Sequence, residues 1–336
     1  MDGTLSPLSS LPPPVSQRGI SRYLIILLFL LLVLGGGWYV VQKFQNLSEK
    51  PKVPKPSIIA RYAVRKEFYD LAQVTDNYEQ AIAKGESLIR EYPDDYYLFH
   101  LTARAYKKKW YKTIDNHLLE RAEELLDVAA RKNPEGKGLF EDVRIIKQLL
   151  LKHEKGISFF QEQLRTLPHL APELNLHIGT LYDAAGDRKR AQQYLSRALK
   201  GDPNQSYAQF LLARLAVGDE GGPNIAVIRE HATQAIELAS TTNALQALGY
   251  PMLAESYIFE KKYQKAADIA RQGIVINPWC SGCHHMLGDA LLGLYQEKNT
   301  RSALEESIQE QEKTIELVPL ATHPYYSLGI GYFLRD

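Results

Sequence analysis

The sequence has very few cysteines and almost no net charge, and each shortage excludes a class of protein. Only two of its 336 residues are cysteines, which excludes a disulfide-rich scaffold. It has 40 Lys and Arg against 39 Asp and Glu, for a formal net charge of +1. Without a strong positive field there is little to attract a nucleic acid, so we expect no nucleic-acid partner.

The sequence also lacks the motifs of common catalytic sites. The Gly-Gly-Pro stretch at 221–223 is not followed by the lysine and helix of a phosphate-binding loop. His100, His177 and His231 stand singly in helical stretches, where a histidine more often packs than binds a ligand. We therefore expect a protein without enzymatic activity and without a cofactor.

The first sixty residues differ in composition from the remainder of the chain. Residues 1–21 are rich in Ser, Pro and Gly and are predicted to be disordered. Residues 22–42 carry no charge after Arg22, and at about 1.5 Å per residue they are long enough to cross a bilayer core of roughly 30 Å. Residues 43–60 are rich in Pro and Lys and are predicted to form an extended spacer.

The apolar run predicts an uncleaved transmembrane helix over residues 22–42. A cleaved signal peptide is the alternative, but the run is long for one and no small-residue cleavage site follows it. We therefore expect a single-pass membrane protein of a bacterial inner membrane that contacts lipid through residues 22–42. The basic residues on both sides of the run leave open on which side of the membrane the remaining chain lies.

From about residue 60 the chain lacks the alternation of strands and shows regularly spaced prolines. Apolar residues recur at spacings of three and four, which indicates helices. A small–apolar–small pattern precedes each proline, as in Ala191, Leu195 and Ala198 ahead of Pro203. The prolines at 93, 134, 168, 203, 278 and 319 are separated by 41, 34, 35, 75 and 41 residues, where 75 corresponds to two units. This period indicates helical repeats, and the small residues let neighbouring helices approach closely.

An apolar residue followed by Gly or Ala stands upstream of the small residues, as at 178–179 and 253–254. With these pairs and turns such as "AAGDRKRA", the chain resembles the tetratricopeptide repeat family, whose unit is a 34-residue pair of antiparallel helices. Residues 172–205 and 247–280 match that unit without a gap. The resemblance implies an all-α fold. It would be a right-handed α-solenoid of tetratricopeptide-type helix hairpins over residues 61–336, with about seven units and a terminal helix, preceded by the transmembrane helix.

A solenoid of this family has a concave face built by the first helix of each unit, where an extended protein segment usually lies. The resemblance therefore implies a membrane-tethered scaffold that recruits or assembles other proteins or peptide segments. The register of the apolar pairs places these residues in the groove: Tyr96, Phe99, Tyr207, Phe210, Arg214, Glu255, Ile258, His285, Asp289 and Tyr326.

Both cysteines fall within one stretch, "NPWCSGCHH". The motif Cys280-x-x-Cys283-His284 has the spacing of c-type haem attachment, so a redox or haem-handling protein is the alternative function. The repeat register offers a simpler interpretation, since it places the motif at the turn between two units. We expect two thiols that pack as small apolar side chains. A reversible disulfide, and a metal site of the cysteines with His284 or His285, remain the alternatives.

The last stretch, "HPYYSLGIGYFLRD", reads as one more first helix. Aromatic side chains cover much of its surface, and burying each is worth roughly 1.5–3 kcal/mol. We therefore expect residues 321–336 to dock on a partner or to mediate self-association.

Overall fold

The computed structural model describes residues 58–73, 77–218, 221–239 and 243–336. The predicted disordered tail (1–21) and transmembrane helix (22–42) lie outside the described residues. So does the predicted spacer (43–60), apart from its last three residues, which are helical. The chain divides into two units, residues 1–64 and 65–336.

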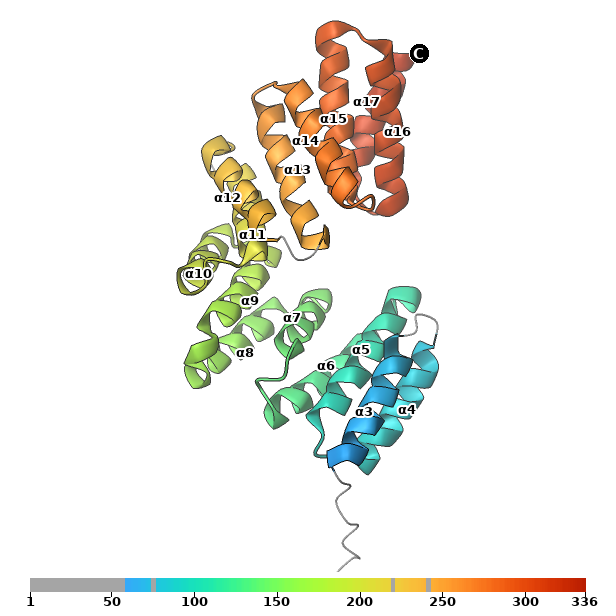
Figure 1. Cartoon of the computed structure of the whole chain (residues 1–336), viewed down its shortest axis with the longest axis vertical. Helices are drawn as coiled ribbons and strands as arrows, with labels where there is room; N and C mark the ends of the chain where they lie inside the picture. The colour runs from blue at the N-terminus through green and yellow to red at the C-terminus, as the bar shows by residue number, and fades with distance from the viewer. Residues whose placement is uncertain (1–57, 74–76, 219–220, 240–242) are drawn as a thin grey trace, which may run out of the picture. The chain divides into compact units, whose positions relative to one another are not determined.

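All regular structure in the described residues is helical, as expected from the spacing of the apolar residues. Successive helices form antiparallel pairs, followed by one further helix (Figure 1). The helices are α3 (Ile58–Gln73), α4 (Tyr78–Glu91), α5 (Tyr96–Thr113), α6 (Asn116–Lys132), α7 (Leu139–Leu149), α8 (His153–Thr166), α9 (Ala171–Ala184), α10 (Arg188–Gly201), α11 (Ser206–Val217), α12 (Ile225–Leu238), α13 (Asn243–Phe259), α14 (Tyr263–Ile276), α15 (Ser281–Lys298), α16 (Arg301–Leu317) and α17 (Thr322–Arg335), with a short 3₁₀ turn at Pro168–Leu170.

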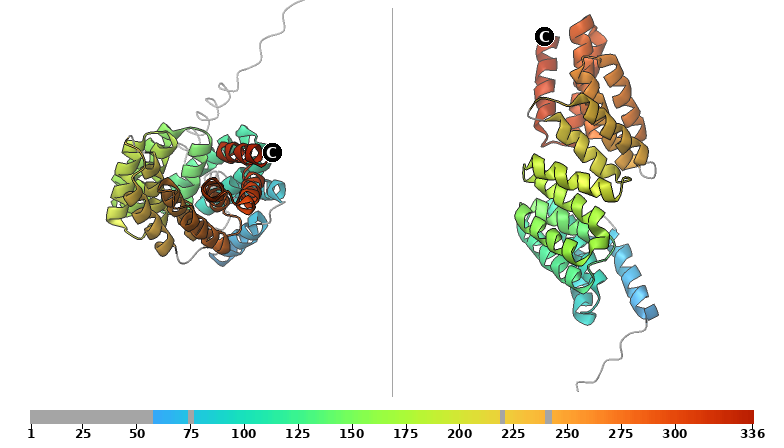
Figure 2. Two further views of the ribbon diagram at one scale, coloured as in Figure 1. Left: turned by 90° about the horizontal axis from the view of Figure 1, so that it is seen from above. Right: turned by 90° about the vertical axis from the view of Figure 1, so that its left-hand side faces the viewer.

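From α5 on, each first helix contacts the first helix of at least one neighbouring pair. These contacts form two runs, α5–α7–α9 and α11–α13–α15–α17, which we call the N-terminal run and the C-terminal run. From α6 on, each second helix contacts both its own first helix and the first helix of the next pair, and α15, α16 and α17 lie side by side (Figure 2). Side chains that point from the first helices away from the second ones can therefore line a common face.

The small–apolar–small pattern marks close helix contacts, as predicted. Ala191, Leu195 and Ala198 of α10 are fully buried. A Cβ atom added to Gly179 of α9 would lie 2.8 Å from Leu195 Cγ and 3.1 Å from the Leu195 backbone nitrogen. Two bulkier residues could not both occupy this contact. The corresponding positions of other pairs are also buried: Ala81, Gly85, Leu88, Ala122, Leu126, Ala129, Gly156, Phe160, Ala266, Ala270 and Gly273.

Several turns within the helix pairs contain a residue in the left-handed region. Gly186 has φ of 82°, while Leu151 and Lys261 adopt 55° and 58° at comparable turns. Glycine takes this conformation readily, but a side chain at the same φ costs about 1–2 kcal/mol. With Ile114 and Asn299, four of the described turns carry a non-glycine residue at positive φ and therefore store local backbone strain.

The predicted localisation in a bacterial inner membrane is corrected by the structure. None of the helices in the described ranges is both long and apolar enough to cross a membrane. The longest, α5 and α15, have 18 residues each and are interrupted by charged residues such as Lys107 and Asp289. A bilayer span needs about 20 predominantly apolar residues in succession.

Candidate functional site

The C-terminal run bounds an open groove. It consists of two adjoining cavities of about 610 and 320 Å³, which share His285 of α15 and His323 of α17. The larger cavity extends from Arg214 of α11 to the loop between α16 and α17, and its walls include Met252, Met286 and Leu320. Because most of the lining is apolar and a few polar groups converge on it, the groove has the composition of a binding site.

Six of the ten predicted groove residues line these cavities. Arg214, Glu255 and His285 line the larger one, and Ile258, Asp289 and Tyr326 line the smaller one together with His285. They come from four first helices that are distant in sequence, and the structure places them along the same two cavities. That they contact a partner remains a prediction.

The other four predicted residues do not line either cavity. Phe99 is only 8% exposed and belongs to the core, with Lys132 Nζ 5.6 Å from its ring centre. Tyr96 is half-buried beside Gly136. Tyr207 and Phe210 are half-buried and stack with ring centres 5.9 Å apart. These four aromatic side chains therefore belong to the hydrophobic core or pack against it.

Glu255 is the most unusual group in the groove. It is half-buried, and the structure gives it no hydrogen bond or ion pair with any described residue. Burial raises the pKa of Glu255, the nearby His285 lowers it, and the negative charge of Asp289 raises it further. A carboxyl group that has lost water without gaining a partner disfavours its charged form.

The polar groups near Glu255 form hydrogen bonds and an ion pair with one another. His285 Nδ1 lies 2.8 Å from Gln311 Oε1, and Gln311 Nε2 donates to Asp289 Oδ1 at 2.9 Å. Since an amide oxygen only accepts, Nδ1 of His285 must carry the proton. Its Nε2 then faces Asp289 Oδ2 at 3.5 Å. These contacts fix the orientation of His285 and Asp289 but leave Glu255 without a partner.

Arg214 does not neutralise Glu255 either. Its guanidinium forms an ion pair with Asp183 and lies over the Phe210 ring, 5.6 Å from the ring centre. Both contacts direct the charge towards α9 and the α11 surface. The groove therefore keeps one uncompensated carboxyl group in its wall.

The N-terminal run carries a buried polar cluster that sequence reasoning missed. His100 Nε2 lies 2.8 Å from Asp142 Oδ2, and Lys107 forms an ion pair with the same carboxylate. Burial alone would raise the pKa of Asp142, but the hydrogen bond from His100 and the charge of Lys107 outweigh it and lower the pKa to about 2. Beside it, Arg144 donates to both oxygens of Glu141 at 3.1 and 2.6 Å.

The expectation that His100 and His177 pack within helices is correct, since both are nearly fully buried. The partner of His100 could not be deduced from the sequence, because Asp142 is 42 residues away and belongs to a different repeat unit. The sequence indicated only that His100 and Asp142 lie on the first helices of adjacent units.

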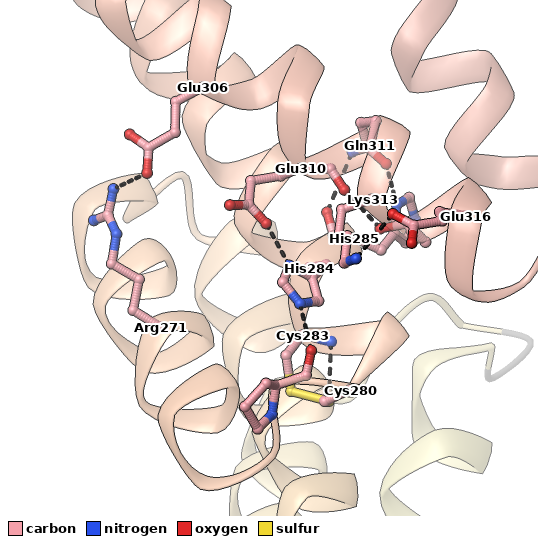
Figure 3. A network of polar contacts seen from close by, with 12 residues as sticks. Arg271, Cys280, Cys283, His284, His285, Glu306, Glu310, Gln311, Lys313 and Glu316 are labelled. Carbon is pink, nitrogen blue, oxygen red and sulfur yellow. Dashed lines mark hydrogen bonds and ion pairs between the residues drawn. A yellow bond between two sulfur atoms is a disulfide. The ribbon is translucent and has the colours of Figure 1, made fainter.

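The expectation of two packed thiols is wrong, because Cys280 and Cys283 form a disulfide (Figure 3). Their Cα atoms are 5.2 Å apart, as the first turn of α15 dictates, and this separation suits a disulfide. Both are largely buried against the Ala247 carbonyl. The two residues between them, Ser281 and Gly282, line the larger cavity.

His284, next to the disulfide, is held by two acceptors. Nδ1 lies 2.5 Å from Glu310 Oε2 (Figure 3), and Nε2 lies 3.1 Å from the Pro278 carbonyl. The hydrogen bond to Glu310 raises the pKa of His284, burial opposes it, and the Pro278 carbonyl adds to the increase. The two sulfurs are bonded to each other, so neither is free for a haem thioether, and the haem alternative has no support. Within the described ranges, no three His, Cys, Asp or Glu side chains are grouped to hold a metal.

The terminal helix α17 presents aromatic side chains to solvent. Tyr326 is 75% exposed and Phe333 is 82% exposed, whereas Gly331 and Pro324 are buried. Docking or self-association through residues 321–336 stays a prediction. Light scattering on the protein and on a Phe333→Ser variant would measure it.

No family model and no curated protein matches this sequence. Among solved structures, it resembles the APC/C hetero-tetramer Cut9–Hcn1, with 14% identity and a TM-score of 0.56 over 80% of this chain and 53% of that one. It also resembles yeast Tom70, with 14% identity and a TM-score of 0.53 over 78% of this chain and 52% of that one. The chain thus spans about half the length of each. Both have helical repeats of tetratricopeptide type, and this chain has a fold of that type.

Proposed function

We propose that the chain is a protein-binding scaffold without enzymatic activity or a cofactor, and that an extended segment of another protein lies in the groove of the C-terminal run. The observation that supports this most directly is the groove itself. It is an open cavity of about 610 Å³ continued by one of about 320 Å³, walled by successive first helices. Helical-repeat scaffolds commonly hold extended segments on such a face.

The composition of the groove supports a peptide as the ligand. Met252 and Met286 offer apolar side chains that adapt to different shapes, while His285, Asp289 and Gln296 can form hydrogen bonds. An extended segment of about ten residues would span about 33 Å, enough to cross several first helices. Such a ligand matches a long open groove better than a compact small molecule does.

The test is a selection of random decapeptides against the purified protein, followed by fluorescence anisotropy on the selected sequences. Ser281→Trp places a large side chain in the larger cavity, and we expect it to weaken peptide binding at least about tenfold. Val275→Trp adds the same side chain to α14, at a position that is 81% exposed and lines neither cavity. Equal affinity in the two variants would place peptide binding elsewhere.

The disulfide supports a second candidate function, thiol–disulfide exchange. Cys280 is the N-cap of α15, and its sulfur accepts a hydrogen bond from the Cys283 backbone N–H at 3.2 Å. A helix N-terminus stabilises a thiolate, so Cys280 would be the leaving thiolate on reduction. Two glutathione molecules would supply the electrons and become oxidised glutathione, leaving two thiols on the protein.

This candidate is tested by equilibrating the protein in glutathione buffers of stepped ratio and counting alkylated thiols by mass spectrometry. A reversible two-electron transition in the folded protein supports exchange chemistry. The burial of both cysteines works against it, because exchange requires access to a sulfur. A disulfide that is reduced only after denaturation would restrict Cys280 and Cys283 to a structural role.

A further inference from the structure

None of the described side chains that line the groove pairs with its half-buried carboxyl group, Glu255. Glu255 has neither a hydrogen bond nor an ion pair to any part of the chain that the structure describes, although it lies in the wall of the larger cavity. Asp289, on the adjoining wall, already accepts from Gln311 and faces His285. The arginine at the edge of the groove, Arg214, is paired with Asp183. The lining thus holds more negative charge than it compensates.

Apolar surface flanks the unpaired carboxyl group on both sides. Met252 and Met286 line the same cavity as Glu255, and Ile258, one helical turn further along α13, lines the adjoining one. A ligand that fits this pattern needs one positive group with apolar groups beside it. Lysine and arginine suit the position, because their aliphatic stems can lie on apolar surface while the charged end reaches a carboxylate.

We propose that the segment bound in the groove is a basic–apolar peptide, in which the cation of a lysine or arginine pairs with Glu255 and flanking aliphatic side chains contact Met252 and Met286. This inference rests on the proposed function and names the chemical class of its partner. The main support for this inference is the charge complementarity between the Glu255 carboxylate and a peptide cation. Burial raises the pKa of Glu255, and the positive charge of an arriving cation would offset this cost by favouring the ionised carboxylate.

The alternative partner is an acidic segment that uses His285 and His323. It fits less well, because Asp289 already faces the His285 imidazole and a second carboxylate would approach both Glu255 and Asp289. Like charges brought together in a half-buried site strongly oppose binding. The experiment below separates the two partners.

Four pools of fluorescent decapeptides test the proposal. Each pool fixes one central residue as Lys, Arg, Gln or Glu, and randomises the other positions among Ala, Leu, Ser, Pro and Gly. We expect the Lys and Arg pools to bind the protein about fivefold more tightly than the Gln pool at low salt, and the Glu pool to bind most weakly. The advantage should shrink as salt is added, because partly exposed ion pairs are screened.

Two variants locate the effect. Glu255→Gln keeps the size of the side chain but removes its charge, and should reduce the preference for Lys and Arg to less than about twofold. Glu297→Gln removes the same charge from an exposed position on α15 that lines neither cavity, and should leave the preference unchanged. Circular dichroism melts confirm that both variants are folded.

The possible outcomes separate this inference from the proposed function. Tight binding without preference for the central residue, preference for the Glu pool, or a Lys preference that survives Glu255→Gln would each overturn the basic-peptide inference and leave the scaffold function standing. Failure of every pool to bind, together with a failed decapeptide selection, would overturn both.

Discussion

The two runs of first helices differ in whether a carboxylate shielded from water has a partner of opposite charge. In the N-terminal run, Asp142 is enclosed by His100 and Lys107, and Arg144 is paired with Glu141. In the C-terminal run, Glu255 has no partner among the described residues, and an open cavity lies beside it. The same type of helix therefore builds a closed polar contact in one place and an open site in the other. The difference lies in whether the neighbouring first helix supplies the opposite charge.

Removing one carboxylate from each run tests whether the two runs differ in this way. Asp142→Asn leaves Lys107 and His100 buried without their anion, and we expect the free energy of unfolding to fall by about 3 kcal/mol. Glu255→Gln removes a charge that has no partner, and should change stability by no more than about 0.5 kcal/mol. Urea denaturation of the two variants measures both. Equal losses would mean that Glu255 is paired after all, or that the Asp142 cluster contributes little.

Strong acid should weaken the N-terminal cluster. The pKa of Asp142 is about 2 in the folded chain, below its ordinary value of 3.8, so its stabilising contribution is present above pH 4 and is lost as the pH falls towards 2. The shift corresponds to about 2 kcal/mol. The stability difference between the protein and Asp142→Asn should accordingly narrow over this range. A difference that stays constant with pH would contradict the low pKa.

The histidine beside the disulfide should respond in the opposite direction. The pKa of His284 is raised by Glu310, so its contribution is complete below the ordinary histidine pKa of 6.5 and is lost as the pH rises through the higher folded value. Comparison of the protein with His284→Gln from pH 5 to pH 9 tests this sign. A stability difference that grows with rising pH would refute the assignment.

Replacing one glycine in each run compares how tightly the helices pack at these two positions. Gly179→Ala in α9 places a Cβ 2.8 Å from Leu195 Cγ and close to its backbone, and should destabilise by about 1–2 kcal/mol. Gly329→Ala in α17 meets no atom within 4 Å, and should stabilise by about 0.5 kcal/mol because alanine favours a helix. Thermal melts of the two variants should move in opposite directions. A rise in stability for Gly179→Ala would mean that Gly179 is not tightly packed, and a fall for Gly329→Ala would mean that the added Cβ is not free of contacts.

The smallest effect is expected where the two halves of the chain are alike. Leu151 and Lys261 both adopt positive φ in the turn of a helix pair. Replacing either with glycine should raise stability by about 0.5–1 kcal/mol, because relief of the left-handed strain exceeds the added entropy of the unfolded chain. Gly186→Ala, at φ of 82°, is the matched reverse change and should lower it. Chemical denaturation would resolve these differences, and a loss of stability in Leu151→Gly would show that this side chain contributes a contact.

The sequence predicted the parts of the structure that depend on local spacing. Ala191, Leu195 and Ala198 are buried as expected, because three- and four-residue spacing places them on one helix face regardless of the rest of the chain. The same register predicted Glu255 and His285 in the groove, and both line the larger cavity, while their contact with a partner stays a prediction. It failed at Phe99, where a large side chain at a groove position turned inwards to fill the core.

Contacts between units could not be predicted in this way. The pairing of His100 with Asp142 depends on how α5 and α7 meet across a unit of irregular length, and no periodic signal records that geometry. The disulfide was only an alternative to the preferred interpretation of two packed thiols, although the i, i+3 spacing of Cys280 and Cys283 permits it. The repeat register explained both cysteines as packing residues, and this explanation was sufficient without a covalent bond.

The disulfide at the start of α15 has a consequence for local motion. The first turn of a helix ordinarily frays, so its amide hydrogens exchange with solvent far faster than those of the helix centre. Here a covalent ring closes around Ser281 and Gly282, the two residues that form part of the cavity wall. This stretch of the groove should therefore remain ordered during opening events that loosen other helix ends, and its slow hydrogen exchange should be lost on reduction.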